Sequence, residues 1–335
     1  MATLQDIADH LHIAKGTVSK ALNDAPDVSE ALKKQVCDTA VALGYVRKRR
    51  VTYDIRRLCI LIENMDYRNR NDFGRDIIIG FRQMAEPAGF DVDVIPLTQE
   101  MQNASSFDVF MIKNRYEGAF FLGYSIYDAW YDGFKTSLTP AVFIDNYIQS
   151  NPRVAFVGVD SLDGINQAVT YLKEAGHKKI GYLTTGTDGF YTRSRYQAYQ
   201  TSLTAAGFSF DPALVGIRNP IAGLIDECFP SILEAGATAV LCSYDEIAVS
   251  LMKRCRELKI RVPEQLAVIG FDDLPAAQRT VPPLTTIHQD RLQLGKTGFY
   301  ALSCLMNQVS ISTILLHPDL IVRGSTGPRK MEENL

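Results

Sequence analysis

The sequence predicts an α/β protein with three short helices at its N-terminus and a larger core of two doubly wound parallel sheets. Within the first 45 residues, apolar side chains recur at helical spacing in short series that stop and resume. From Leu58 onward, short apolar runs alternate with helix-length amphipathic stretches. This order is typical of a parallel sheet covered by helices on both faces. Nine such runs between residues 58 and 287 indicate two lobes rather than one large sheet.

Size and composition fit this architecture and exclude several classes of protein. The chain has 335 residues, more than the ~150 of an ordinary domain. Its 46% hydrophobic and 22% charged residues are typical of a globular protein. It has no apolar run of about 18 residues that could span a membrane, and we expect no secretory signal. The six cysteines lack metal-ligand spacing, and Cys59 and Cys242 lie in apolar runs. We therefore expect a cytoplasmic protein with reduced cysteines, no metal site and no cofactor.

The charge of the chain is unevenly distributed. The formal net charge is −3. Residues 1–57 contain ten Lys/Arg and seven Asp/Glu, so this segment carries +3 and the remainder carries −6. A basic head on an acidic body indicates a protein that touches DNA with one end only.

The first two helices are predicted within residues 4–23. An apolar series from Leu4 to Leu11 stops at His12, and a second series runs from Val18 to Leu22. Two short helices joined by a tight turn have the helix-turn-helix layout. The other face of the second helix carries polar and small residues that can reach phosphates and base edges in a major groove. These residues are Lys15, Gly16, Ser19, Lys20 and Asn23. An amphipathic hairpin with a solvated face is the alternative.

A third helix and a basic arm come next. Ser29 can cap this helix, whose apolar residues recur from Leu32 to Leu43, and Gly44 is a natural stop. Residues 46–57, VRKRRVTYDIRR, have no apolar periodicity. We expect their basic run to contact phosphates or the minor groove, with a merely solvated linker as the alternative. The run consists of Arg47, Lys48, Arg49 and Arg50.

The elements of the core follow from the alternating pattern. Strands are expected at residues 58–62, 91–95, 118–122, 141–144, 154–159, 180–183, 239–242, 266–271 and 285–287. Helices are expected near residues 76–86, 105–114, 162–175, 194–206, 223–235, 245–258 and 290–307.

Polar residues directly after the predicted strands form a candidate ligand site. In doubly wound sheets, ligands bind beyond the carboxyl ends of the strands. The residues at these ends are Glu63, Asn64, Tyr124, Asp145, Asn146, Thr184, Thr185, Ser243, Tyr244, Asp245, Asp272 and Asp273. Carboxylates, amides, hydroxyls and aromatic rings that converge in this way suit a polyhydroxylated ligand such as a sugar or a nucleoside. For any single residue, a loop carboxylate that caps the next helix is the alternative.

Nothing in the sequence argues for catalysis. No GxGxxG follows a strand, and GxxxxGK[ST], HExxH and GxSxG are absent. The loop TTGTDGF at residues 184–190 could hold a phosphate, but a plain turn is the favoured interpretation. None of the five histidines is paired in sequence with a nucleophile.

Residues 3–23 resemble the DNA-binding head of the lactose/galactose repressor family of bacterial transcription regulators. The run GTVSKALN (16–23) follows DIA (6–8) and precedes VS (28–29) and LGY (43–45). The resemblance continues through the core in family order. The core motifs are TPAVFID (139–145), VGVDSLDG (157–164), LKEAGHKKIGYL (172–183), YDEIA (244–248), VPEQLAVIGFDD (262–273) and PPLTTI (282–287).

The resemblance implies a head and a periplasmic-binding-protein-like core of two lobes. The implied segments are a head at 1–46, a linker at 47–57, a first lobe at 58–156 and 286–315, and a second lobe at 157–285 and 316–328. It also implies a homodimer that binds near-palindromic double-stranded operator DNA. A small effector between the lobes would change the affinity for DNA. The last ten residues have no leucine heptad, so we expect a dimer rather than a tetramer.

The resemblance also implies roles for individual residues. Lys15, Gly16 and Lys20 would read bases, whereas Thr17, Ser19 and Asn23 would contact phosphates. The effector positions are Phe73, Asp145, Arg195, Tyr244, Asp245 and Asp272, and Tyr124 is added by the strand-end rule alone. The run RYQAY assigns Arg195, with Ala198 in place of a family glycine.

Three positions depart from the family pattern. His12 replaces a turn glycine, which histidine tolerates at positive φ better than most residues. Ala14 replaces a capping serine and so loses about 1 kcal/mol of helix capping. The arm lacks the Pro-Asn and Ala-Arg-x-Leu of the family hinge, whose leucine wedges into the minor groove. We therefore expect Arg47 to Arg50 to bind electrostatically.

The sequence thus predicts a ligand-responsive DNA-binding regulator, and more specifically a repressor. Its effector is expected to be a sugar, with a nucleobase, a nucleoside or a phosphorylated metabolite as alternatives. A cytoplasmic solute-binding protein and a doubly wound enzyme are the competing classes. The first is disfavoured by the DNA-binding head, and the second by the missing phosphate and nucleophile motifs.

Overall fold

The computed structural model describes residues 2–45, 56–144 and 146–327. These residues divide into two compact units. Unit 1 consists of the described residues within 1–66, 76–157 and 292–314. Unit 2 consists of the described residues within 67–75, 158–291 and 315–335. No helix among the described residues is long and apolar enough to cross a membrane.

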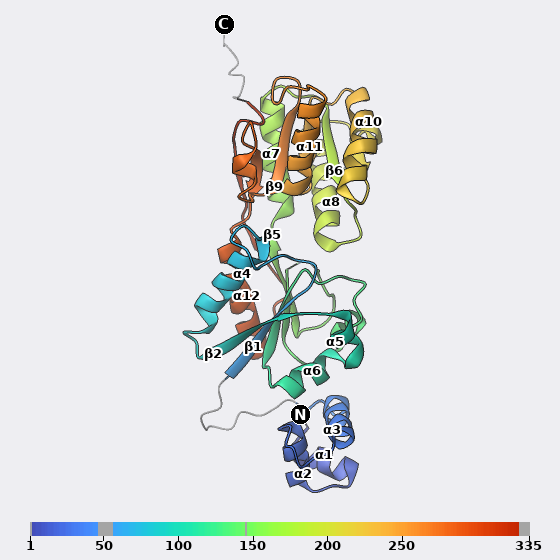
Figure 1. The fold of residues 1–335 in the computed structure, drawn as a ribbon, viewed down its shortest axis with the longest axis vertical. Helices are drawn as coiled ribbons and strands as arrows, with labels where there is room; N and C mark the ends of the chain where they lie inside the picture. Colours follow the sequence, from blue (N-terminus) through green and yellow to red (C-terminus); the bar gives the residue numbers. More distant parts are fainter. Residues whose placement is uncertain (1, 46–55, 145, 328–335) are drawn as a thin grey trace. The chain divides into compact units, whose positions relative to one another are not determined.

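The head contains α1 (Leu4–Leu11), α2 (Lys15–Leu22) and α3 (Glu30–Ala42), drawn in blue in Figure 1. Thr3 and Asp6 form a capping box at the start of α1, and Ser29 Oγ accepts the Leu32 N–H at the start of α3. His12 has the left-handed conformation at φ 52°, and Ala14 gives α2 no side-chain cap. The structure therefore confirms three predictions: Ser29 caps α3, His12 has a positive φ in the turn, and Ala14 provides no side-chain cap for α2.

The sheet of unit 1 has the strand order β11-β5-β4-β3-β1-β2. Its strands are β1 (Arg56–Ile62), β2 (Phe90–Pro96), β3 (Gly118–Leu122), β4 (Ala141–Phe143), β5 (Val154–Val159) and β11 (Thr313–Leu316). Its helices are α4 (Phe73–Ala85), α5 (Gln99–Ala104), α6 (Phe107–Asn114) and α12 (Arg291–Met306). Because side chains alternate along a strand, Phe120 stacks on Phe81 of α4, while Phe121 packs against Phe107 of α6. The sheet is therefore covered by α4 and α12 on one face and by α5 and α6 on the other (Figure 1).

The sheet of unit 2 has the order β12-β10-β9-β8-β6-β7. Its strands are β6 (Ile180–Thr184), β7 (Val215–Ile217), β8 (Ala239–Cys242), β9 (Ala267–Asp272), β10 (Thr285–His288) and β12 (Asp319–Ile321). Its helices are α7 (Ser161–Glu174), α8 (Phe190–Ala205), α9 (Ile221–Gly223), α10 (Phe229–Glu234) and α11 (Asp245–Glu257), with a π-helical turn at Leu224–Cys228. One hydrophobic cluster lies under α10 and α11, and a second lies under α7 and α8. Both faces of this sheet are therefore covered as well.

The structure confirms the α/β fold and the nine expected strands, whose ends move by at most two residues. Three further strands, β7, β11 and β12, were not predicted from the sequence; they have three or four residues, most of which are partly exposed. A short and incompletely buried strand produces no apolar run. In addition, β12 pairs with β10 in the antiparallel direction, so this sheet is not wholly parallel.

Candidate functional site

The polar face of α2 is open to solvent. Val18, Ala21 and Leu22 are buried in the core of the head. On the opposite face the predicted base readers Lys15, Gly16 and Lys20 are exposed, while Thr17 and Ser19 are half-buried. No heavy atom lies within 4 Å of the place where a Cβ on Gly16 would stand. The helix can therefore approach another surface closely at this point.

Two residues of this face already have partners in the head. Lys20 Nζ lies 2.5 Å from Asp27 Oδ2 in the loop between α2 and α3. Asn23 is exposed, and its Nδ2 donates to the Ser19 carbonyl at 2.7 Å. The predicted contacts Arg47, Lys48, Arg49 and Arg50, and the predicted effector residue Asp145, lie outside the described residues.

In unit 2, Arg195 and Asp272 form an ion pair at the carboxyl end of the sheet. Arg195 projects from α8, and Asp272 ends β9. Nη2 of Arg195 lies 3.2 Å from Asp272 Oδ1, and the two side chains are only 7% and 13% exposed. Nη1 donates to the Ser243 carbonyl at 2.5 Å, and the guanidinium stacks 3.6 Å from the Phe271 ring centroid. The cation is therefore fixed on three sides.

Only one of the two carboxylate oxygens of Asp272 accepts hydrogen bonds from the described residues. Oδ1 accepts hydrogen bonds from Arg195 and from Gln289 Nε2, the latter at 2.6 Å. Oδ2 accepts none from the residues that the structure describes. Burial raises the pKa of Asp272 to about 6, and the charge of Arg195 opposes this rise. The residue has φ 116°, which is a strained conformation for a non-glycine residue.

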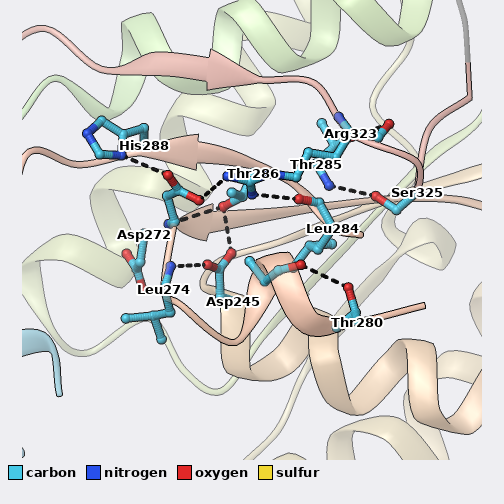
Figure 2. A network of polar contacts seen from close by, with 12 residues as sticks. Asp245, Asp272, Leu274, Thr280, Leu284, Thr285, Thr286, His288, Arg323 and Ser325 are labelled. Carbon is cyan, nitrogen blue, oxygen red and sulfur yellow. Dashed lines mark hydrogen bonds and ion pairs between the residues drawn. The ribbon is translucent and has the colours of Figure 1, made fainter. Parts of the chain in front are cut away.

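Asp245, the first residue of α11, faces the protein rather than an open site. It is fully buried. Its Oδ2 accepts the Leu274 N–H at 2.7 Å, and its Oδ1 accepts the Thr286 hydroxyl at 2.6 Å (Figure 2). A Cβ on Gly270 would stand 2.1 Å from Oδ1, so that glycine makes room for the carboxylate. Asp245 thereby ties α11 to the loop after β9 and to β10, and burial raises its pKa to about 8.

Aromatic side chains lie around the same end of unit 2. The hydroxyl of Tyr244 is 2.9 Å from Thr185 Oγ1, and burial raises the pKa of this phenol. The guanidinium of Arg291 lies 5.8 Å from the ring centroid of Phe73, which clusters with unit 2. Nη1 of Arg291 donates to the carbonyl oxygens of Asp272 and Asp273. The arginine thus links the Phe73 ring to the Asp272 loop.

Tyr124 has a different environment in unit 1. The side chain is 2% exposed and packs among Phe121, Phe134 and Phe143. Its hydroxyl lies 3.4 Å from Gln102 Oε1, and burial raises its pKa. A ligand that contacted this side chain would have to open the aromatic core.

Two residues that hold Asp272 and its loop, Gln289 and Arg291, were not predicted from the sequence. Gln289 is the second residue after the strand expected at 285–287, at the same offset as Asn64 and Asn146 after their strands, so the strand-end signal for it was present in the sequence. Arg291 has no sequence signal, because its role depends on the fold of the Asp272–Asp273 loop. Two buried polar atoms nearby, Arg195 Nε and Ser243 Oγ, have no hydrogen-bond partner among the described residues.

Comparisons with known proteins agree with this architecture. Residues 169–326 match a family model described as a periplasmic binding protein-like domain. The chain is 28% identical over 334 residues to the HTH-type transcriptional repressor CytR of Escherichia coli K12, covering 97% of this chain and 96% of that protein. It is 26% identical over 339 residues to the repressor PurR of Mannheimia succiniciproducens, covering 97% and 98%.

Solved structures share the fold over nearly the whole chain. The structure of the transcriptional regulator CelR in complex with cellobiose is similar with a TM-score of 0.69 and 23% sequence identity. The similarity covers 97% of this chain and 100% of that chain. The lac repressor dimer bound to operator and the anti-inducer ONPF has a TM-score of 0.67 at 22% identity, covering 98% and 99%. The relatives in sequence are transcriptional repressors and not enzymes. Over nearly its whole length the chain is therefore similar to bacterial HTH-type transcriptional repressors, and residues 169–326 match a periplasmic binding protein-like domain.

Proposed function

We propose that this regulator is a homodimeric repressor that reads an operator with α2 and binds a small sugar-like effector at the Asp272 site. The main support for an effector at this site is the fixed position of the Asp272 carboxylate. Arg195 and Gln289 hold Oδ1, while Oδ2 accepts no hydrogen bond from the described residues. An oriented carboxylate oxygen with spare capacity is a strong acceptor for a ligand hydroxyl.

The surroundings of Asp272 support a ligand with both polar and apolar faces. Ser243 Oγ and Arg195 Nε are buried without a partner in the described part of the chain, and a bound ligand could satisfy such atoms. The Phe73 and Tyr244 rings supply apolar surface. A sugar offers hydroxyls along its edge and C–H groups on its faces, and one structural neighbour was solved as a complex with cellobiose, which supports a sugar as the effector.

A nucleobase or nucleoside is the second candidate, favoured by the Phe73 ring, on which a base could stack. A phosphorylated metabolite fits less well. The charge of Arg195 is already compensated by Asp272 at 3.2 Å, whereas a phosphate requires a cation that is not neutralised. We therefore rank the sugar first and the phosphorylated compound last.

On the DNA side, we propose that Lys15, Gly16 and Lys20 face base edges in the major groove. Thr17, Ser19 and Asn23 would bind phosphates beside them. The exposure of Lys15, Gly16, Lys20 and Asn23, and the open space over Gly16, support this arrangement. The run from Arg47 to Arg50 would add sequence-independent contacts to the DNA backbone.

Thermal-shift measurements on the full-length protein would test the effector proposal with a panel of sugars and nucleosides. Compounds that raise the melting temperature would then be added to the protein bound to an operator selected from random-sequence DNA. We expect a sugar to raise the melting temperature and to change operator affinity. In Asp272→Asn both effects should fall while operator affinity without effector stays the same. An unchanged ligand response in this variant would contradict the assigned site.

Sedimentation of the protein with the selected operator tests the remaining parts of the proposal. We expect two chains on one near-palindromic duplex. A single chain bound per duplex, or binding without any sequence preference, would contradict it.

A further inference from the structure

An exposed ion pair joins the DNA-reading face of α2 to the loop before α3. Lys20 Nζ lies 2.5 Å from Asp27 Oδ2, and the two side chains are 59% and 55% exposed. The hydrogen bond from Lys20 lowers the pKa of Asp27 below its ordinary value of 3.8. A predicted base-reading cation is therefore paired with a carboxylate of its own head.

The loop that carries Asp27 is anchored on both sides. The next residue, Val28, is buried in the core of the head, and Ser29 caps α3. Before Asp27, the Ala25 N–H donates to the Lys20 carbonyl at 3.0 Å. The backbone thus keeps the Asp27 carboxylate next to α2.

The neighbouring charges of this loop are paired elsewhere. Lys33, whose side chain is 9% exposed, lies 2.6 Å from Asp24 and 2.8 Å from Glu30. Asp24 and Glu30 therefore pair with Lys33 rather than with Lys20. Asp27 is the acidic residue of this loop that pairs with the DNA-reading face.

This pairing changes what Lys20 can contribute to DNA binding. A free lysine gains from any phosphate, whatever the sequence, by releasing counterions. A lysine held by a carboxylate brings no net charge, and the carboxylate repels the phosphates. Exposed ion pairs are weak, so a well-placed acceptor pair such as guanine O6 and N7 can still draw the ammonium away.

Within the proposed function as an operator-binding regulator, we propose that Asp27 is a specificity-determining residue. It suppresses the contribution of Lys20 to non-specific binding and reserves the ammonium for base edges in the operator. Asp27 acts through Lys20 and need not touch DNA itself.

The test is Asp27→Asn in the full-length protein. Fluorescence anisotropy would measure its affinity for the selected operator and for a scrambled duplex of the same length and composition, between 50 and 200 mM salt (roughly the range over which counterion release is resolved). On the scrambled duplex we expect the slope of log affinity against log salt to steepen by about one, and the affinity at low salt to rise about tenfold. Operator affinity should rise less, so the ratio of operator to scrambled affinity should fall.

Two controls distinguish the release of Lys20 from the general effect of removing one negative charge from the head. Asp38→Asn removes the same charge from an exposed position on α3, and we expect it to change the salt slope by much less. In a Lys20→Ala background, the effect of Asp27→Asn should become much smaller, because only the repulsion between the Asp27 carboxylate and the phosphates remains and the double-mutant cycle isolates the pair. Melting temperatures of all variants would show that the head still folds.

The possible failures are distinguishable. If Asp27→Asn and Asp38→Asn change the salt slope equally, or if the Asp27→Asn effect is undiminished in Lys20→Ala, the inference is wrong while the proposed function stands. If the wild-type protein shows no preference for the selected operator, the proposed function is wrong, and this inference falls with it.

Discussion

Lys20 in the head and Arg195 in unit 2 are both cations paired with an aspartate, but only the first pair is surrounded by water. The Lys20 and Asp27 side chains are 59% and 55% exposed, against 7% and 13% for Arg195 and Asp272. The exposed pair rests on one contact between flexible side chains. The buried pair is fixed further by Gln289, by the Ser243 carbonyl and by the Phe271 ring.

This difference suits the two proposed tasks. Exposed charges are screened by salt and exchange partners cheaply, which suits a surface that must slide over many DNA sequences and stop at one. Buried charges hold a fixed geometry, because each loses its hydration and depends on its partner. Such a site is preorganised for one small ligand.

The largest effect is expected from Arg195→Ala. Removal of one partner leaves the Asp272 carboxylate buried without its cation, which typically costs about 3–5 kcal/mol. Urea unfolding of the full-length protein should show a clearly lower midpoint. The matched control is Arg218→Ala, which breaks an exposed pair with Glu227 at 2.8 Å and should cost at most about 1 kcal/mol. Equal losses in the two variants would refute the contrast between buried and exposed pairs.

Asp245 should make unit 2 less stable as the pH rises. Burial raises its pKa in the folded protein to about 8, from an ordinary value of 3.8. Between these values the folded state holds a proton that the unfolded state releases. The slope of unfolding free energy against pH is therefore negative, and stability is lost from about pH 4 to pH 8.

Asp245→Asn removes this titration and retains one acceptor and one donor at the same place. Its urea midpoint should change less between pH 5 and pH 8 (roughly the upper part of that interval) than the wild-type midpoint does. Asp272, with a pKa raised to about 6, contributes in the same direction, and its charge also raises the pKa of Asp245, so the difference between the two proteins reports Asp245 together with its interaction with Asp272. Parallel pH profiles would mean that Asp245 is ionised in the folded state.

The sequence predicted elements better than it predicted the direction of side chains. Buried runs such as Leu58–Ile62 and the periodicity of the head are local signals, and they located helices and strands within about a turn. The strand-end rule selected Asp245, Asp272 and Tyr124 alike, but their environments differ. Asp245 points to Leu274 and Thr286, which lie 29 and 41 residues further along the chain.

No local pattern encodes such distant partners. The same reason hides Arg291, whose importance depends on the strained loop at Asp272 and Asp273. Asp27 could not be predicted for the same reason. A carboxylate in a loop between helices is common, and only the structure shows that it lies next to Lys20.

Replacement of Lys20 by alanine tests whether the cation of the exposed pair contacts bases or only phosphates. If Lys20 reads a base, Lys20→Ala should weaken operator binding by ~1–3 kcal/mol and should affect scrambled DNA much less. Anisotropy titrations on both duplexes would measure the two losses. A uniform loss on every sequence would mean that Lys20 contacts only phosphate, in which case Asp27 could not restrict it to bases.

The smallest effect is expected from Ala14→Ser at the start of α2. Thr3 caps α1 through its side chain, whereas Ala14 has extended backbone angles suited to a cap but no acceptor to offer. A serine there should accept an orphan N–H of the first turn and stabilise α2 by about 1 kcal/mol. Hydrogen exchange of the α2 amides in the full-length protein should slow about fivefold. Ala14→Val, which also lacks an acceptor, should not slow it. Equal exchange in the serine and wild-type proteins would show that α2 opens only together with the rest of the head, so that its uncapped end is not where the DNA-reading face first comes apart.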